Sequence, residues 1–245
     1  MSSIKTDAIV LRYANYGESD RMLTLLSPTM GLLSVSARGC RKATSKSLAA
    51  SELFTAGEYL LYQKGERYTL SSFQLQENYY PIRLDVDKLA HGVYWLNLCE
   101  AVVQPWEDCS RLFKMLLLSL AVLAYGELPL RALTAVFLTQ FAMLQGCAPR
   151  LDRCSRCGKA LSAPMRFDVE LGGACCAACT QGGLPLHETT LAWLKEAQDK
   201  GAFVLAGRRE LPQTPSKYAA EEAFNIMRAH VEHRVDKHIS SGRFL

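Results

Sequence analysis

The chain has 245 residues, which is enough for one large domain or two to three small ones. Hydrophobic residues make up 49% and charged residues 21%, as in a globular protein rather than a disordered or fibrous one. The net charge is +4, the longest apolar run (residues 115–125) is too short to span a bilayer, and residues 1–7 lack the apolar core of a signal peptide, so we expect no membrane contact.

The first 80 residues have the patterns of β-structure. Residues 4–12 alternate between two faces, and residues 21–26 and 32–37 form two more candidate strands around turn-forming residues 27–31. Residues 58–63 and 68–75 flank a glycine-containing hairpin connection. Five short strands in so short a segment predict an OB-fold barrel over residues 1–80.

Helical periodicity follows the barrel region. Residues 84–103, 110–125 and 130–145 are three candidate helices, and Gly146 stands just past the third, where a C-terminal glycine is common. Helices resume at residues 186–200 and 215–239. We therefore predict an α+β multidomain chain, with a helical domain at residues 81–150 and 186–245 that is interrupted by residues 151–185.

That interruption contains two cysteine pairs, Cys154-x2-Cys157 and Cys176-x2-Cys179, separated by eighteen residues. The spacing is typical of a four-thiolate zinc site, so we expect one Zn²⁺ bound tetrahedrally. Such a site has no open position for water and is structural rather than catalytic. Cys175 adjoins Cys176 and could replace it as a ligand, although the x2 spacing favours Cys176.

The other cysteines outside the two pairs and Cys175 are Cys40, Cys99, Cys109 and Cys147. They lie in apolar or helical contexts typical of buried free thiols, so we expect the protein to be located in the reducing cytoplasm. His230 and His233 share a helix face, but two solvated histidines are the more economical interpretation. Glu18 and Asp20 could form an acid pair, but we expect them to stabilise a turn and to pair with Arg21. No phosphate-binding loop, nucleophile elbow or HExxH motif is present, so the sequence does not indicate an enzyme.

Basic residues are concentrated near the barrel strands. Residues 21–51 contain no acidic residue and five basic ones, whereas residues 81–150 contain six of each sign. The basic set is expected to contact DNA: Arg21, Arg38, Arg41, Lys42 and Lys46. Aromatic residues that could stack on bases accompany it: Tyr13, Tyr16, Tyr59, Tyr62, Tyr68 and Phe73. The alternatives are a solvated charged loop and aromatic residues of the barrel core.

At these residues the sequence resembles the RecO family of bacterial recombination mediators. The resemblance runs from residues 16–21 through Gly31 to residues 37–42, and resumes at residues 235–245. The order of a small barrel and a helical domain interrupted by four cysteines also resembles the family.

The resemblance implies a protein without enzymatic activity that binds single- and double-stranded DNA and anneals complementary strands. It also implies that, with RecR, the protein helps RecA to load onto DNA covered by single-strand DNA-binding protein. The helical domain would contact the acidic C-terminal tail of that protein, with Arg111, Lys114 and Arg131 as candidate contacts.

Three other functions are compatible with part of the sequence. A zinc-ribbon nucleic-acid module would need a basic cysteine segment, but residues 151–185 are nearly neutral. A protein scaffold without annealing activity would make the basic loop incidental. A hydrolase with a structural zinc would need a nucleophile and base, and no such pair is evident.

Overall fold

The computed structural model describes residues 2–45, 47–205, 215–235, 241, 242 and 245. The chain divides into two compact units, one formed by Met1–Leu117 with Ser241–Leu245 and the other by Leu118–Ser240. The division falls within the helix α3 (Ser110–Tyr125). Within the described residues, no helix is both long enough and apolar enough to cross a membrane.

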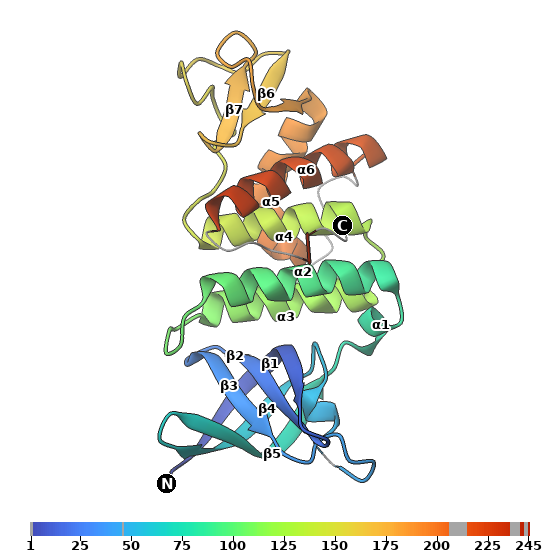
Figure 1. Ribbon diagram of the computed structural model, residues 1–245. Helices are drawn as coiled ribbons and strands as arrows, with labels where there is room; N and C mark the ends of the chain where they lie inside the picture. The colour runs from blue at the N-terminus through green and yellow to red at the C-terminus, as the bar shows by residue number, and fades with distance from the viewer. Residues whose placement is uncertain (1, 46, 206–214, 236–240, 243–244) are drawn as a thin grey trace. The chain divides into compact units, whose positions relative to one another are not determined.

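The first unit begins with a closed five-stranded barrel (Figure 1). Its strands are β1 (Ser2–Tyr16), β2 (Asp20–Ser27), β3 (Gly31–Ala37), β4 (Ala56–Lys64) and β5 (Arg67–Glu77). Their order is β1-β2-β3-β5-β4, with β1 returning to β4 and β3 pairing parallel to β5. This is the OB-fold connectivity, and the predicted barrel is confirmed.

Strand β1 is longer than its alternating pattern predicts because it serves two neighbours. Its first half pairs with β4 from Ser2 to Ile9, and its second half pairs with β2 from Ile9 to Tyr16. An irregularity between Val10 and Arg12 separates the two halves. A bend of this kind lets one strand close a barrel, and the apolar side chains of all five strands then share one core.

Helical elements complete the first unit. A short 3₁₀ turn, η1 (Ala49–Ser51), precedes β4, and α1 (Tyr80–Arg83) leads into α2 (Val86–Val102). Asp85 caps α2 by accepting hydrogen bonds from the Asp87 and Lys88 backbone N–H groups. The loop between α2 and α3 is tied to the β2–β3 turn, where Trp106 N donates to Met30 O at 2.7 Å and Cys109 N donates to Pro28 O at 2.8 Å.

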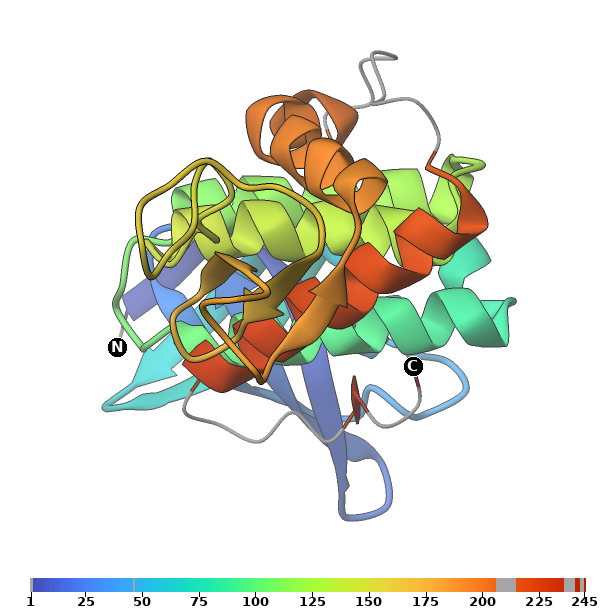
Figure 2. The same cartoon turned by 90° about the horizontal axis from the view of Figure 1, so that it is seen from above.

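The second unit is built on α4 (Leu130–Leu144), in which every residue from 132 to 142 is buried. Two helices pack on it, α5 (Glu188–Leu205) and α6 (Lys217–Arg234), as Figure 2 shows. Helix α5 continues past the predicted end at residue 200. The predicted end of α6, residues 236–239, lies outside the described residues.

A small antiparallel sheet, which the sequence patterns did not predict, carries part of the cysteine segment. Its order is β7-β6-β8, with β6 (Met165–Asp168) between β7 (Gly173–Cys176) and β8 (Leu184–Leu186). Strands of three or four residues are too short for alternation to identify them. Pairing of β6 with β7 nevertheless fixes the backbone that carries Cys176.

Candidate metal centre and nucleic-acid interface

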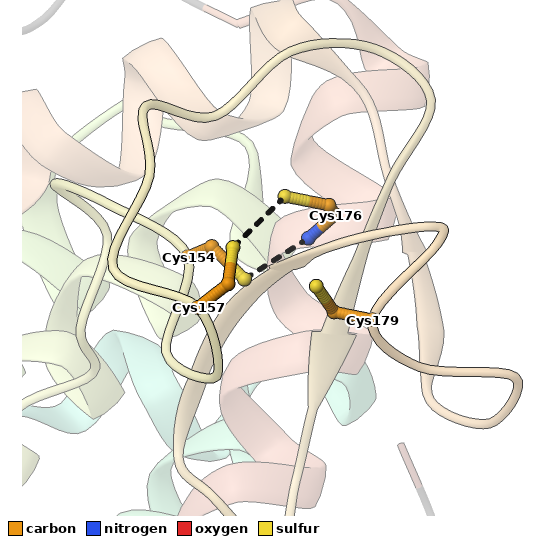
Figure 3. A group of neighbouring side chains, drawn as sticks. All are labelled: Cys154, Cys157, Cys176 and Cys179. Atoms are coloured by element: carbon orange, nitrogen blue, oxygen red, sulfur yellow. Dashed lines mark hydrogen bonds between the residues drawn. The ribbon is translucent and has the colours of Figure 1, made fainter.

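The four predicted cysteines converge within the second unit. The Sγ atoms of Cys154, Cys157, Cys176 and Cys179 all lie within 4.8 Å of one another and face a common centre (Figure 3). The Cys157 and Cys176 sulfurs are 3.9 Å apart. Four Zn–S bonds of about 2.3 Å in a tetrahedron place the sulfurs about 3.8 Å apart. The distances between the cysteine sulfurs are therefore close to those of a zinc site.

Tight backbone turns bring each pair together. Gly158, at a φ of +71°, donates from its N–H to Cys154 O at 2.9 Å, closing the first turn. The Cys179 N–H donates to Cys176 O at 2.9 Å in the second turn. The two turns are connected because Cys176 N donates to the Cys154 sulfur at 3.4 Å. Hydrogen bonds of the chain itself therefore hold the two cysteine pairs close together.

Cys175 is not part of the cluster. Its side chain is fully buried and its sulfur lies 4.0 Å from Gly173 O. Successive residues of a strand point to opposite faces, so Cys175 and Cys176 of β7 cannot both face the other three sulfurs. The structure thus selects Cys176, as the x2 spacing favours.

The electrostatics of the cluster suit a cation. Backbone N–H groups, that of Cys157 foremost, lower the pKa of Cys154 to about 5. The neighbouring Cys157 sulfur, followed by burial, raises the pKa of Cys179 to about 12, and the Cys154 sulfur chiefly raises that of Cys176. The chain thus favours the Cys154 thiolate and opposes those of Cys176 and Cys179, and a bound metal cation would favour the thiolate form of these ligands. A cluster of four thiol ligands can hold a soft metal ion but leaves no open coordination position.

The basic loop of residues 38–42 follows β3 at one end of the barrel. Arg38, Arg41 and Lys42 are all exposed there. The loop is fixed to the β1–β2 turn: Arg41 N donates to Ser19 O at 2.9 Å, and the Arg41 guanidinium donates to Gly17 O at 3.4 Å. Lys46 lies outside the described residues.

Asp20 provides a further contact between the turn and the loop. Its Oδ1 accepts a hydrogen bond from the Gly39 backbone N–H at 2.7 Å and another from the Ser19 hydroxyl at 3.0 Å. These two bonds, the Gly39 bond first, lower the pKa of Asp20 below its usual range. The expected turn-stabilising role of Asp20 is confirmed. No sequence pattern indicated the bond to Gly39, nineteen residues away.

Arg21 is separated from the other basic side chains by its environment. Its side chain is only 11% exposed and forms an ion pair with Glu52 at 2.8 Å. Nη1 also donates to the Ser51 carbonyl and hydroxyl oxygens at 3.0 Å, and the guanidinium carbon lies 4.0 Å from the centre of the Tyr13 ring. The expectation that Arg21 pairs with the acids of the turn is therefore wrong; its partner is Glu52.

The aromatic candidates divide in the same way. Tyr59 and Tyr68 are buried in the barrel core, where Tyr59 packs against Phe73, so the core interpretation holds for them. Tyr13 is covered by Arg21. Tyr16 is 68% exposed and ends β1 next to Gly17, which Arg41 contacts. Tyr16 is consequently the aromatic side chain best placed beside the basic loop; Tyr62 is exposed farther along β4.

The expectation of two solvated histidines is wrong for His230. His230 is buried, its Nε2 donates to Cys147 O at 2.7 Å, and its ring meets Phe167 edge-on. It is not a solvated histidine, because α6 turns this face toward the cysteine segment. His233 is exposed as expected. Among the described residues, the four cysteines form the one group suited to hold a metal ion.

Comparison with known proteins agrees with this architecture. Residues 1–79 match the N-terminal part of recombination protein O, and residues 83–243 match its C-terminal part. The chain belongs to the RecO family. It is 34% identical over 251 residues to "DNA repair protein RecO" of Anaeromyxobacter sp. (strain K), covering all of this chain and 96% of that protein.

Other RecO proteins are similarly related. The protein of Pelotomaculum thermopropionicum is 36% identical over 179 residues, covering 73% of this chain and 69% of the relative. That of Moorella thermoacetica is 27% identical over 243 residues, covering 98% and 90%. The predicted RecO resemblance is confirmed, and with it a DNA repair protein that is a recombination mediator and not an enzyme.

The three residues expected to contact the tail of single-strand DNA-binding protein differ in accessibility. Arg111 and Lys114 are exposed on α3. Arg131 is half-buried on α4, where it lies 4.3 Å from the Phe224 ring centre and 3.5 Å from a Glu221 carboxylate oxygen. Arg131 is thus already engaged within its own unit.

Proposed function

We propose that this RecO-family protein binds single- and double-stranded DNA and anneals complementary strands through the basic loop of its barrel. The observation that carries the proposal is the anchored loop with Arg38, Arg41 and Lys42 exposed at one barrel end. Cations presented from a fixed backbone neutralise phosphates on both strands, which lowers the repulsion that opposes pairing. No covalent step is required.

Each of the remaining basic residues has its own proposed role. Lys46 extends the positive loop in the sequence. Arg21 supports the barrel beneath the loop, because its guanidinium is engaged with Ser51, Glu52 and the Tyr13 ring. Tyr16 offers an exposed ring beside the loop on which a base can stack.

The metal proposed for the four cysteines is Zn²⁺, one per chain. Four thiolates in a tetrahedral cluster are a typical structural zinc set, and bound zinc would screen the repulsion among the sulfurs. The ion would stabilise the segment that connects α4 to α5, and it would supply no chemistry to annealing. Cys154, Cys157, Cys176 and Cys179 would hold it.

The proposed partners are those of a recombination mediator acting in the bacterial cytoplasm. With RecR, the protein would help RecA to load onto DNA covered by single-strand DNA-binding protein. The acidic tail of that protein would meet cations of the helical region, for which Arg111 and Lys114 are the accessible candidates. These partner assignments rest on family membership and on charge.

The decisive experiment replaces Arg38, Arg41 and Lys42 together with alanine. We expect single-strand affinity to fall at least about tenfold at low salt. The log–log salt slope should shrink by about 2, because each phosphate that the loop neutralises on a single strand contributes about 0.7 to it. Annealing of complementary oligonucleotides should slow in parallel. Fluorescence anisotropy over a salt series and a quenched-fluorophore annealing assay measure the two effects.

The matched control removes the same charge elsewhere. Lys159, Lys195 and Lys217 are exposed in the second unit, and their triple alanine variant also loses three positive charges. We expect this variant to keep most of the affinity and the annealing rate. Equal losses in both variants would show that net charge, and not the barrel loop, governs binding. Unchanged binding in the loop variant would refute the proposed DNA face.

A further inference from the structure

An acidic side chain lies at the base of the proposed DNA loop. Asp20 begins β2, and its carboxylate accepts a 2.7 Å hydrogen bond from the backbone N–H of Gly39. The positive charges of Arg38 and Lys42 act on this carboxylate, yet both hydrogen bonds that it accepts come from Gly39 and Ser19. Among the described residues, neither cation comes within ion-pair distance of Asp20.

Gly39 is well suited to this contact. It has a φ of +64°, the left-handed conformation that turns its N–H back toward β2. Lys42 N then donates to Gly39 O at 3.2 Å, and Arg41 N donates to Ser19 O at 2.9 Å. Residues 39–42 are therefore held by three hydrogen bonds made by main-chain N–H groups, and the bond to Asp20 is the shortest and the charged one.

A carboxylate in this place opposes DNA binding through its charge. A negative group beside Arg38 and Lys42 repels phosphate and subtracts from the positive potential of the loop. If charge alone decided affinity, loss of Asp20 would strengthen binding. The hydrogen bond from Gly39 to Asp20 strengthens DNA binding instead, because a loop that is already ordered loses less conformational entropy when it binds.

We propose that Asp20 is a positioning residue of the DNA face. It holds the backbone at Gly39 so that Arg38, Arg41 and Lys42 are presented together, and this benefit exceeds the repulsion of its charge. The inference rests on the proposed function of the loop. It goes beyond that function by assigning a specific role in binding to a residue that touches no phosphate.

The sign of the change in affinity tests the inference. Three variants are compared: Asp20→Ala removes charge and acceptor, Asp20→Glu keeps the charge but moves the oxygens by one methylene, and Glu18→Ala removes an exposed charge from the same turn. We expect Asp20→Ala and Asp20→Glu to bind single-stranded oligothymidylate about fivefold more weakly, a loss below that of one charged hydrogen bond. Glu18→Ala should bind equally or up to about twofold more tightly.

The salt dependence gives a second readout that loss of fold would not produce. Because the loop cations remain, the log–log slope of Asp20→Glu should equal that of the wild type, while its affinity is lower at every salt concentration. Asp20→Asn, which keeps an acceptor oxygen and removes the charge, should restore affinity to the wild-type level or above. Melting temperatures of all variants establish that they fold.

Two results would overturn the inference. The first is DNA binding by Asp20→Ala that is tighter than wild type, as expected for Glu18→Ala. The second is wild-type affinity in Asp20→Glu, and this result decides the question if Asp20→Ala does not fold. Either result would leave the proposed function intact, provided that the triple loop variant still loses binding. If the triple variant binds normally, the DNA face itself is wrong.

Discussion

The basic loop and the cysteine cluster both hold groups that carry, or can carry, the same charge close together. In the loop these side chains point outward over a surface, whereas in the cluster they converge on one point. Arg38, Arg41 and Lys42 are exposed around a backbone that is fixed to the β1–β2 turn. The four cysteine sulfurs converge within 4.8 Å. Each set would gain stability from a counterion. A convergent set is satisfied by one small ion, whereas a set spread over a surface suits an extended polyanion.

The contrast explains why the cysteine cluster is proposed to have a structural role and the basic loop a role in DNA binding. Four converging thiolates leave no open coordination position on a bound ion, so a metal held there would stabilise the fold and nothing more. The loop cations retain exposed donors because Asp20 binds the Gly39 main chain and not their side chains. The same distinction separates Arg21, whose guanidinium is engaged by Ser51 and Glu52, from the exposed cations of the basic loop.

The largest effect is expected when the convergent site is broken. Cys154→Ser removes the sulfur that receives backbone hydrogen bonds and has the lowered pKa. Structural zinc sites couple metal affinity to folding, so the variant should lose the metal and its melting transition should fall by about 10 °C or more. Elemental analysis of protein purified without chelator and circular dichroism melts measure both quantities.

Cys175→Ala is the matched control, because it removes an adjacent sulfur that lies outside the cluster. It should retain the full metal content and lose only about 1 kcal/mol for the small buried void. Metal loss in this variant would mean that Cys175, and not Cys176, is the ligand. Wild-type protein without bound metal would contradict the metal proposal itself.

Arg21→Ala is expected to have the next largest effect, and the effect should fall on stability. The substitution removes the 2.8 Å ion pair of Glu52, which then keeps only Arg83 at 3.8 Å, and it leaves the Ser51 carbonyl without the Arg21 donor. The loss should cost about 2–3 kcal/mol in the free energy of unfolding. Arg38→Ala, at an exposed position, should change stability by no more than about 0.5 kcal/mol while reducing DNA affinity. Urea unfolding of the two variants distinguishes a supporting arginine from a binding one; equal stabilities would contradict the assignment.

The sequence predicted the features that local patterns encode. Alternation and turn residues located the five strands, and paired spacing located the four cysteines. It could not place Arg21, because burial of that side chain depends on Ser51 and Glu52, thirty positions later in the chain. The bond between Asp20 and Gly39 was missed for the same reason, since a hydrogen bond across two loops leaves no periodic signal.

His230 shows how tertiary packing overrides a helix pattern. From sequence, its position on a basic C-terminal helix suggested a solvated side chain, and the strands that cover this helix face were not predicted. Phe167 of β6 and the Cys147 carbonyl enclose the ring. A prediction of β6 would have been needed to expect that burial, and a four-residue strand is too short to reveal itself.

The buried histidine leads to the smallest expected effect, a dependence of stability on pH. Burial, together with the positive charges of Arg234 and His233, lowers the pKa of His230, although its hydrogen bond to Cys147 O acts in the opposite direction. The unfolded chain therefore binds a proton more readily than the folded one. The stabilisation is fully present above the unfolded pKa of about 6.5 and is lost as pH falls toward the lower folded value.

Melting temperatures measured from pH 8 to pH 6 should accordingly decrease more in the wild type than in His230→Gln. The glutamine amide can still donate to the Cys147 carbonyl but does not titrate, so the variant isolates the proton from the hydrogen bond. His233→Gln, which removes an exposed histidine from the same helix, should keep the wild-type dependence. Metal content should be measured at each pH so that loss of a bound metal is not mistaken for protonation of His230. With metal content unchanged, identical pH profiles in the wild type and His230→Gln would show that the buried ring contributes nothing to the acid sensitivity.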